Sequence, residues 1–146
     1  MKEDFLQVAI EEAKIALLIN EVPVGAVIVK DGKIISRAHN LRETLRNPLA
    51  HAEVLAIKKA CEVTSDWRLT GCELYVTLEP CPMCAGAIVQ SRIKRVYIGA
   101  FDPKAGACGS IMNVLQNEAL NHFVDTKWLY DEECSRILQD FFKSKR

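Results

Sequence analysis

Two short segments carry metal-binding side chains and constrain the fold more than any other feature of this chain. They are His51-Ala52-Glu53 and, later, Pro80-Cys81-Pro82-Met83-Cys84. Cys81 and Cys84 are separated by two residues, a spacing that lets both thiolates reach one ion. Each segment is predicted to begin a helix, where free N–H groups and the helix dipole favour a negatively charged sulfur. The chain must therefore bring two helix starts from separate segments together.

The combination of His51, Cys81 and Cys84 predicts a catalytic zinc site. Zinc prefers nitrogen and sulfur ligands in a tetrahedron, and three protein ligands leave the fourth position for water. Zinc lowers the pKa of bound water to about 7. Glu53 is close enough in sequence to stand beside that water and move its proton without binding the metal. C-x-x-C alone also occurs in redox pairs and structural fingers, but the joint H-A-E and P-C-x-x-C pattern is the zinc-deaminase signature.

Predicted helices alternate with strands along the chain, which is typical of an α/β sandwich. The sheet is expected to begin as a hairpin about Asp31-Gly32 and to continue parallel through helical crossovers. The predicted strands are 24–29, 33–39, 73–78, 95–100 and a weak strand near 123–127. The predicted helices are 4–19, 51–63, 81–91, a short one at 111–121, and 131–142.

Length and composition indicate one globular domain spanning residues 1–146. The acidic start is unlike a signal peptide, and no apolar stretch approaches the ~20 residues of a membrane span. We therefore expect a reducing cytoplasm, in which the six cysteines are ligands or packing residues rather than disulfides. Lys plus Arg and Asp plus Glu each total 19, so the formal net charge is zero. Any nucleic-acid partner must be held by local basic patches.

Beyond its zinc motifs, the chain resembles bacterial tRNA-specific adenosine deaminases, within the cytidine deaminase-like superfamily. The resemblance lies in NEVPVGAVIV, NPLAHAEVLAI, LYVTLEPCPMCAGAIVQSRI, GAFDPKAGACGS and DFFKSKR. It implies a three-layer α/β/α sandwich with a mixed five-stranded sheet and one zinc ion per subunit. It also implies a cytoplasmic homodimer and a hydrolase that converts the wobble adenosine of an arginine tRNA anticodon to inosine, releasing ammonia.

The same resemblance implies roles for individual residues. His51, Cys81 and Cys84 would bind zinc, and Glu53 would be the catalytic proton shuttle. The residues that would contact the substrate are Asn40, Ala52, Asp102, Lys104 and Phe142.

Each substrate assignment has a plainer alternative. Asn40 and Asp102 also suit turns, Lys104 suits a solvated surface, and Phe142 suits a helix core. The basic tail, Lys143, Lys145 and Arg146, suits either a phosphate contact or a solvated end. The apolar segments 88–93 and 111–115 are candidates for the dimer contact.

Two other functions stay open at this point. A deaminase of free guanine, cytosine or cytidine would share the four zinc-site residue types. Such an enzyme gives no reason for Asp102-Pro103-Lys104 or for an aromatic, basic tail. A non-catalytic zinc domain or RNA-binding module would need a fourth protein ligand and would not need Glu53.

Overall fold

A mixed five-stranded sheet forms the centre of the protein, seen in a computed structural model that describes residues 2–145, with side chains from residue 5 onward. The strand order is β2-β1-β3-β4-β5. β1 runs antiparallel to β2 and β3, whereas β3, β4 and β5 are parallel. The bounds are β1 Gly25–Lys30, β2 Lys33–His39, β3 Cys72–Val76, β4 Arg95–Ile98 and β5 Asp125–Trp128.

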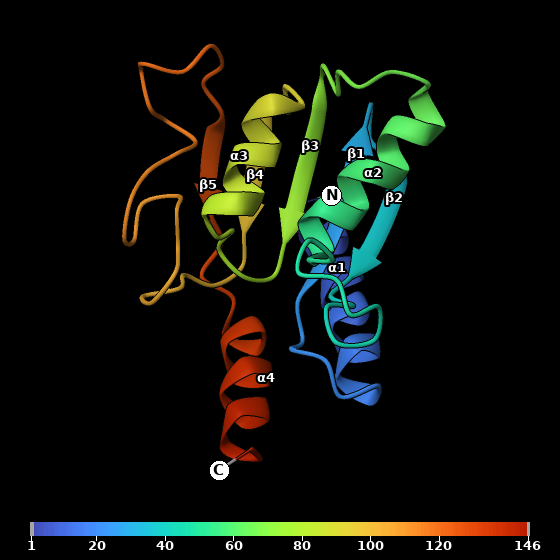
Figure 1. The fold of residues 1–146 in the computed structure, drawn as a ribbon, viewed down its shortest axis with the longest axis vertical. Helices are drawn as coiled ribbons and strands as arrows, with labels where there is room; N and C mark the ends of the chain where they lie inside the picture. The colour runs from blue at the N-terminus through green and yellow to red at the C-terminus, as the bar shows by residue number, and fades with distance from the viewer. Residues whose placement is uncertain (1, 146) are drawn as a thin grey trace.

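Helices cover both faces of this sheet and complete the expected α/β/α sandwich. α2 and α3 lie on one face and α1 on the other, and α4 extends beyond the end of the sheet (Figure 1). The packing agrees, because one apolar cluster contains residues of α2 and α3, and a second contains residues of α1 and α4. The bounds are α1 Lys2–Leu18, α2 Ala52–Thr64, α3 Pro82–Gln90 and α4 Glu132–Lys143.

β1 shows why the sheet is buried on both faces. Its side chains alternate, so Ala26 and Ile28 pack toward α2 and α3 while Val27 and Val29 pack toward α1. All four are at most 2% exposed. A strand that is buried on both faces has a continuous run of apolar residues, and the strand at 24–29 was predicted from such a run. The predicted hairpin is also present, with positive φ at Asp31 and Gly32.

The predicted helix at 111–121 is wrong. This segment forms turns and bends within the long loop between β4 and β5, and only Cys108 and Asn113 form an isolated bridge. Asn side chains explain the difference: the Oδ1 of Asn113 accepts from the Gln116 N–H, and that of Asn117 from the Ala119 N–H. Such local bonds stabilise turns in competition with a helix. The β4–β5 crossover is therefore a loop, and not a helix as expected.

The two segments proposed for a dimer contact differ in exposure. Ile88 and Ile93 of segment 88–93 are fully buried in this chain's own core. Ile111 and Met112 are exposed. Across residues 2–145, no helix combines the length and apolar character needed to cross a membrane.

Candidate functional site

The parallel arrangement of β2, β3 and β4 brings the predicted site residues together at one edge of the sheet. β2 and β3 both run opposite to β1, and β4 is parallel to β3. Asn40 follows β2, Cys81 lies in the segment after β3, and Asp102 lies in the loop after β4. Because the carboxyl ends of parallel strands meet at the same edge, this edge is where α/β proteins commonly place their sites.

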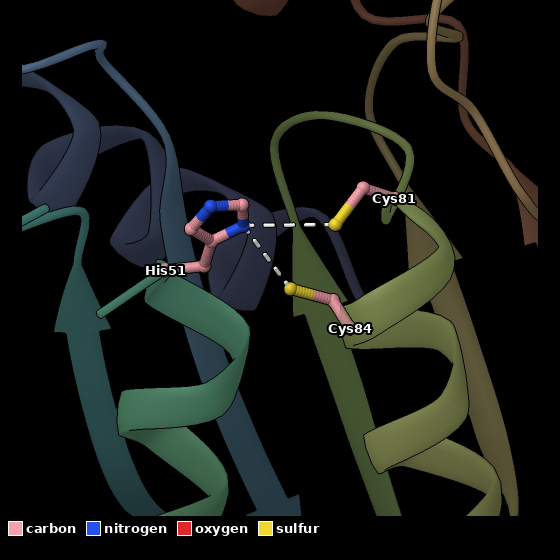
Figure 2. A group of neighbouring side chains, drawn as sticks. All are labelled: His51, Cys81 and Cys84. Atoms are coloured by element: carbon pink, nitrogen blue, oxygen red, sulfur yellow. Dashed lines mark hydrogen bonds between the residues drawn. The ribbon is translucent and has the colours of Figure 1, made fainter. Parts of the chain in front are cut away.

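His51 and Cys81 occupy equivalent places in two neighbouring helices. Each is the N-cap residue of its helix, α2 or α3, with an extended backbone. Neither side chain makes a capping hydrogen bond to its helix, so both can point across the gap between the two helices. Cys84 adds a second sulfur from the first turn of α3, and Figure 2 shows the three side chains converging. Their ligand atoms all lie within 4.8 Å of one another.

The distances fit a tetrahedral metal ion. The Nδ1 of His51 lies 3.7 Å from the Sγ of Cys81 and 3.4 Å from the Sγ of Cys84. Zinc–nitrogen and zinc–sulfur bonds of ordinary length, set at the tetrahedral angle, separate nitrogen and sulfur by about 3.6 Å. One imidazole and two sulfurs are also the ligand types that zinc prefers. The donor set therefore suits zinc without rearrangement.

The electrostatics of this group favour a ligand-ready sulfur. The hydrogen bond from the Cys84 thiol, together with the effect of His51, lowers the pKa of Cys81 to about 4, against the opposing effect of burial. A thiolate, and not a thiol, is the form that binds metals. Cys81 therefore holds a negative charge near neutral pH even before a cation is considered.

Glu53 lies in the first turn of α2, one residue beyond Ala52, and is only 4% exposed. Burial raises the pKa of Glu53 to about 7, although a backbone hydrogen bond opposes that rise. A carboxyl group with a pKa near the working pH can both accept and donate a proton. Its burial and its place beside the metal-binding group suit the predicted role as a proton shuttle.

A cleft of about 830 Å³ opens beside these residues. All five predicted substrate-contacting residues line it, together with His51, Glu53 and Cys81. Cys84 is fully buried behind them. The cleft therefore unites residues from four separate parts of the chain: Asn40, then Ala52, then Asp102 and Lys104, then Phe142.

Asn40 has the contacts of a turn residue. Its Oδ1 accepts from the Arg42 N–H at 3.1 Å, and its Nδ2 donates to the Val22 carbonyl at 3.3 Å. This is the plainer role that the sequence left open. An amide offers two N–H donors and an oxygen with two lone pairs, so these two bonds use half of its capacity. Asn40 lines the cleft, so its second N–H and its second lone pair can bond to a molecule there.

Asp102 likewise forms a turn at the cleft rim. Its Oδ1 accepts from the N–H groups of Lys104 and Ala105 at 3.0 and 3.2 Å. Turn chemistry is thus present, and it holds the loop in one shape. Lys104 is exposed beside it. The rim at this point carries one acidic and one basic side chain facing solvent.

The two adjacent phenylalanines of α4 have different surroundings. Phe141 is 7% exposed and packs inward, whereas Phe142 is 51% exposed and lines the cleft. Lys143 lines the cleft as well, and Lys145 bonds to the Asn20 side chain at the end of α1. Arg146 lies outside the described residues. Phe141 therefore belongs to the apolar face of α4 that packs against the core, and Phe142 does not.

Two buried acids that the sequence did not assign to the site support the cleft walls, and one of them, Glu79, also lines the cleft. Glu21 is 1% exposed, and its carboxylate accepts from the N–H groups of Glu43 and Thr44 in the loop between β2 and α2. Glu79 lines the cleft itself and is 2% exposed. Both lie in the motifs that resemble the deaminases, and the signal in the sequence was an acid among apolar residues.

All six cysteines are free, and Cys108 is buried.

Comparisons with known proteins give a consistent result. Residues 1–146 match the MafB19-like deaminase family. A tRNA-specific adenosine deaminase of Bacillus subtilis is 53% identical over 145 residues, covering 99% of this chain and 90% of that protein. One from Aquifex aeolicus is 54% identical over 145 residues, covering 99% of this chain and 96% of that protein.

Solved structures extend the comparison to the fold. A chain from a study of A-to-I editing by tRNA deaminases at the wobble position of transfer RNA matches with a TM-score of 0.90. It is 44% identical, and the match covers 93% of this chain and 99% of that one. Guanine deaminase from Bacillus subtilis matches with a TM-score of 0.67 at 35% identity, covering 97% and 93%.

Proposed function

Because the chain belongs to the tRNA-specific adenosine deaminases, within the MafB19-like deaminase family, we propose that it acts at the wobble adenosine of a tRNA anticodon. The reaction is a hydrolysis: water replaces the 6-amino group of the base, giving inosine and ammonia. The observation that carries the proposal is the grouping of His51, Cys81 and Cys84 beside the buried carboxyl of Glu53, at the floor of one cleft. We propose an arginine tRNA as the substrate.

His51, Cys81 and Cys84 would hold one zinc ion per subunit, which agrees with their donor types and spacing. Bound zinc supplies a water of lowered pKa, which can attack the base near neutral pH. His51 offers a neutral nitrogen, and the two sulfurs offer negative charge that balances the ion.

Glu53 would carry the protons of the reaction. It takes one proton from the attacking water and delivers it to ring N1 of the adenine. It then helps to protonate the departing amine, so that ammonia leaves and the base becomes hypoxanthine. A pKa of about 7 suits both directions of this transfer. Its burial keeps bulk water away from the group while the proton moves.

The cleft walls would position the target base and its neighbours. The free half of the Asn40 amide can bond to the base, and the Ala52 N–H belongs to the first turn of α2, where N–H groups have no partner within the helix. Asp102 and Lys104 on the rim would contact the sugar and phosphate 5′ of the target. The exposed face of Phe142 would stack on an unpaired anticodon base.

A second candidate substrate is a free purine base. The likeness to guanine deaminase, at 35% identity and a TM-score of 0.67, favours it. The basic, aromatic rim argues for RNA instead, because a free base carries no phosphate for Lys104 and no neighbouring base for Phe142. A non-catalytic zinc site would need a fourth protein ligand. Among the described residues, only three possible ligands, His51, Cys81 and Cys84, come together.

One experiment separates these substrates. Zinc-loaded protein is incubated in parallel with an arginine anticodon stem–loop, free adenosine, cytidine and guanine, and products are resolved by chromatography. We expect inosine in the stem–loop alone. A variant with Glu53→Gln serves as the catalytic control. Product from a free base or nucleoside at a comparable rate would overturn the proposal.

We further propose that residues 1–146 form one zinc-dependent deaminase domain and that two copies associate as a cytoplasmic homodimer. Exposed Ile111 and Met112, in the long loop between β4 and β5, provide apolar surface for an isologous contact. Light scattering during gel filtration measures the assembly directly. A monomer mass for the wild type at micromolar concentration would contradict this part of the proposal.

A further inference from the structure

Glu79 connects the metal-binding segment to the opposite wall of the cleft. It lies two residues before Cys81, in the turn between β3 and α3, and is 2% exposed. Its side chain points toward the segment 100–110, which follows β4 and which we name the 100–110 loop. That loop carries Asp102 and Lys104.

The carboxylate of Glu79 accepts four hydrogen bonds, all from this loop. Oε1 accepts from the Asp102 N–H at 2.9 Å and from the Ser110 hydroxyl. Oε2 accepts from the N–H groups of Cys108 and Ser110 at 2.9 and 3.1 Å. One side chain therefore holds both the beginning and the end of the loop. Hydrogen bonds to a charged acceptor are the strong ones, especially where burial excludes water.

Backbone contacts and a glycine complete this attachment. The Glu79 N–H donates to the Ala100 carbonyl at 2.8 Å, and the Ala107 N–H donates to the Pro80 carbonyl at 2.9 Å. At Gly106, a Cβ would lie 2.3 Å from the Glu79 carboxylate. Only glycine leaves room for the carboxylate at this place. The loop is thus built around Glu79.

We propose that Glu79 is a positioning residue for the RNA substrate: it sets the place of Asp102 and Lys104 relative to the metal-binding residues. Because Cys81 follows Glu79 so closely, the loop and the metal centre share one short piece of backbone as their common support. This inference rests on the proposed function. All four hydrogen bonds of its carboxylate go to the loop, so the proposed role of Glu79 acts through the loop and not on the reacting base.

The substitution Glu79→Gln tests this with little change of shape. An amide has one oxygen and one NH₂ group, so in either orientation its NH₂ group faces N–H donors. We expect KM for the anticodon stem–loop to rise by about tenfold or more, since hydrogen bonds to a charged, buried acceptor are lost. We expect kcat to stay within about threefold, because binding contacts rather than proton transfer are disturbed. Zinc content should equal that of the wild type.

A matched control distinguishes positioning from general loss of stability. Glu12 is also buried, at 7% exposure, but it joins α1 to β2 outside the cleft by bonds to Arg37 and His39. We expect Glu12→Gln to lower the melting temperature and to leave KM unchanged. If both variants raise KM equally, or if Glu79→Gln loses zinc in proportion to activity, the positioning role is wrong.

A double-mutant cycle identifies the route of the effect. If Glu79 acts through Asp102, the KM effects of Glu79→Gln and Asp102→Ala are not additive, and the double variant resembles Asp102→Ala alone. Additive effects would overturn the proposal. If Glu79→Gln does not fold, Ser110→Ala removes one donor and Gly106→Ala crowds the carboxylate. We then expect KM to rise about two- to threefold for Ser110→Ala, and more for Gly106→Ala, with an unchanged KM for both overturning the role.

The wild-type measurement separates the two proposals. Wild-type protein that does not deaminate the stem–loop contradicts the proposed function. Active wild-type protein whose KM is insensitive to Glu79→Gln contradicts only the positioning role.

Discussion

The Nδ1 of His51 lies 3.7 Å from the Sγ of Cys81, and each of these residues is the N-cap of its own helix. N-cap side chains commonly accept a capping hydrogen bond from a backbone N–H in the first turn of their helix, but neither of these makes such a bond. The two helices therefore leave their first N–H groups without side-chain caps and direct both side chains at each other. Because neither side chain is used for capping, both are available as ligands, and this is how the metal-binding group forms.

Glu53→Gln should abolish turnover and leave the metal in place. The amide keeps the shape of the side chain but cannot accept the water's proton, so we expect kcat to fall by about 10²- to 10⁴-fold. Single-turnover assays on the stem–loop measure the rate, and elemental analysis measures zinc. Loss of zinc together with activity would show that Glu53 is a ligand instead.

Removal of zinc should abolish activity reversibly. Because His51, Cys81 and Cys84 are the only described residues that meet as a metal-binding group, a chelator should inactivate the protein and added zinc should restore it. The melting temperature should also fall, since a ligand that binds only the folded state stabilises it. Calorimetry with and without chelator measures this.

Replacing one of the three metal-binding residues should also cause loss of zinc. We expect Cys84→Ala to reduce bound zinc by at least about tenfold, because loss of even an outer-sphere partner has an effect of that size. Cys61→Ser is the matched control, since Cys61 is partly exposed and outside the group. Equal zinc content in the two variants would contradict the assigned ligand set.

Acid should weaken the attachment of α1 to β2. Burial opposes ionisation of Glu12, but hydrogen bonds from His39 and Arg37, at 2.8 and 2.7 Å, outweigh it and lower the pKa of Glu12 below 4.5. A carboxyl whose pKa is lower in the folded state stabilises the fold above its unfolded pKa. That stability is lost as the pH falls below 4.5 and through the folded pKa.

We therefore expect Glu12→Gln to be less stable than the wild type by about 1–3 kcal/mol at pH 7, with the difference shrinking as the pH falls below about 4.5. Urea denaturation between pH 3 and 7 measures the free energy of unfolding of both proteins. Stability curves that stay parallel over the whole range would show that Glu12 is not the group responsible.

Phe142→Ala should weaken RNA binding without affecting the fold. Base–aromatic stacking contributes about 1–3 kcal/mol per base, so we expect KM for the stem–loop to rise by about 5- to 150-fold. Leu18→Ala is the control, because Leu18 is 86% exposed and does not line the cleft. An unchanged KM for Phe142→Ala would assign its exposed ring to another contact.

Local sequence was sufficient for much of the fold and for the metal-binding group. The strand 33–39 and the turn at Asp31-Gly32 were predicted as they occur, because hairpin turns depend on neighbouring residues. His51, Cys81 and Cys84 were recognisable because each motif has a fixed short spacing. The prediction of a helix at 111–121 was wrong because helix propensity does not account for the turns that the side chains of Asn113 and Asn117 stabilise.

Long-range contacts explain what the sequence did not reveal. Glu79 bonds to residues between Asp102 and Ser110, far along the chain, so the apolar residues around it mark the acid as unusual but do not reveal its partners. Asn40 lines the cleft, as a substrate contact requires, but its bond to Val22 depends on how two loops meet. Composition also concealed the local basic residues of the rim, since the charges of the whole chain cancel.

Glu21 and Glu79 hold the two sides of the cleft mainly through backbone N–H groups, with one hydroxyl donor each from Thr44 and Ser110. Every residue except proline supplies such a group, so the anchors are largely indifferent to which side chains the loops carry. If Lys104 contacts RNA as proposed, substitution of such rim residues would change which nucleotides are accepted. The loop backbone would keep its path during such changes, and the catalytic group behind it would stay intact.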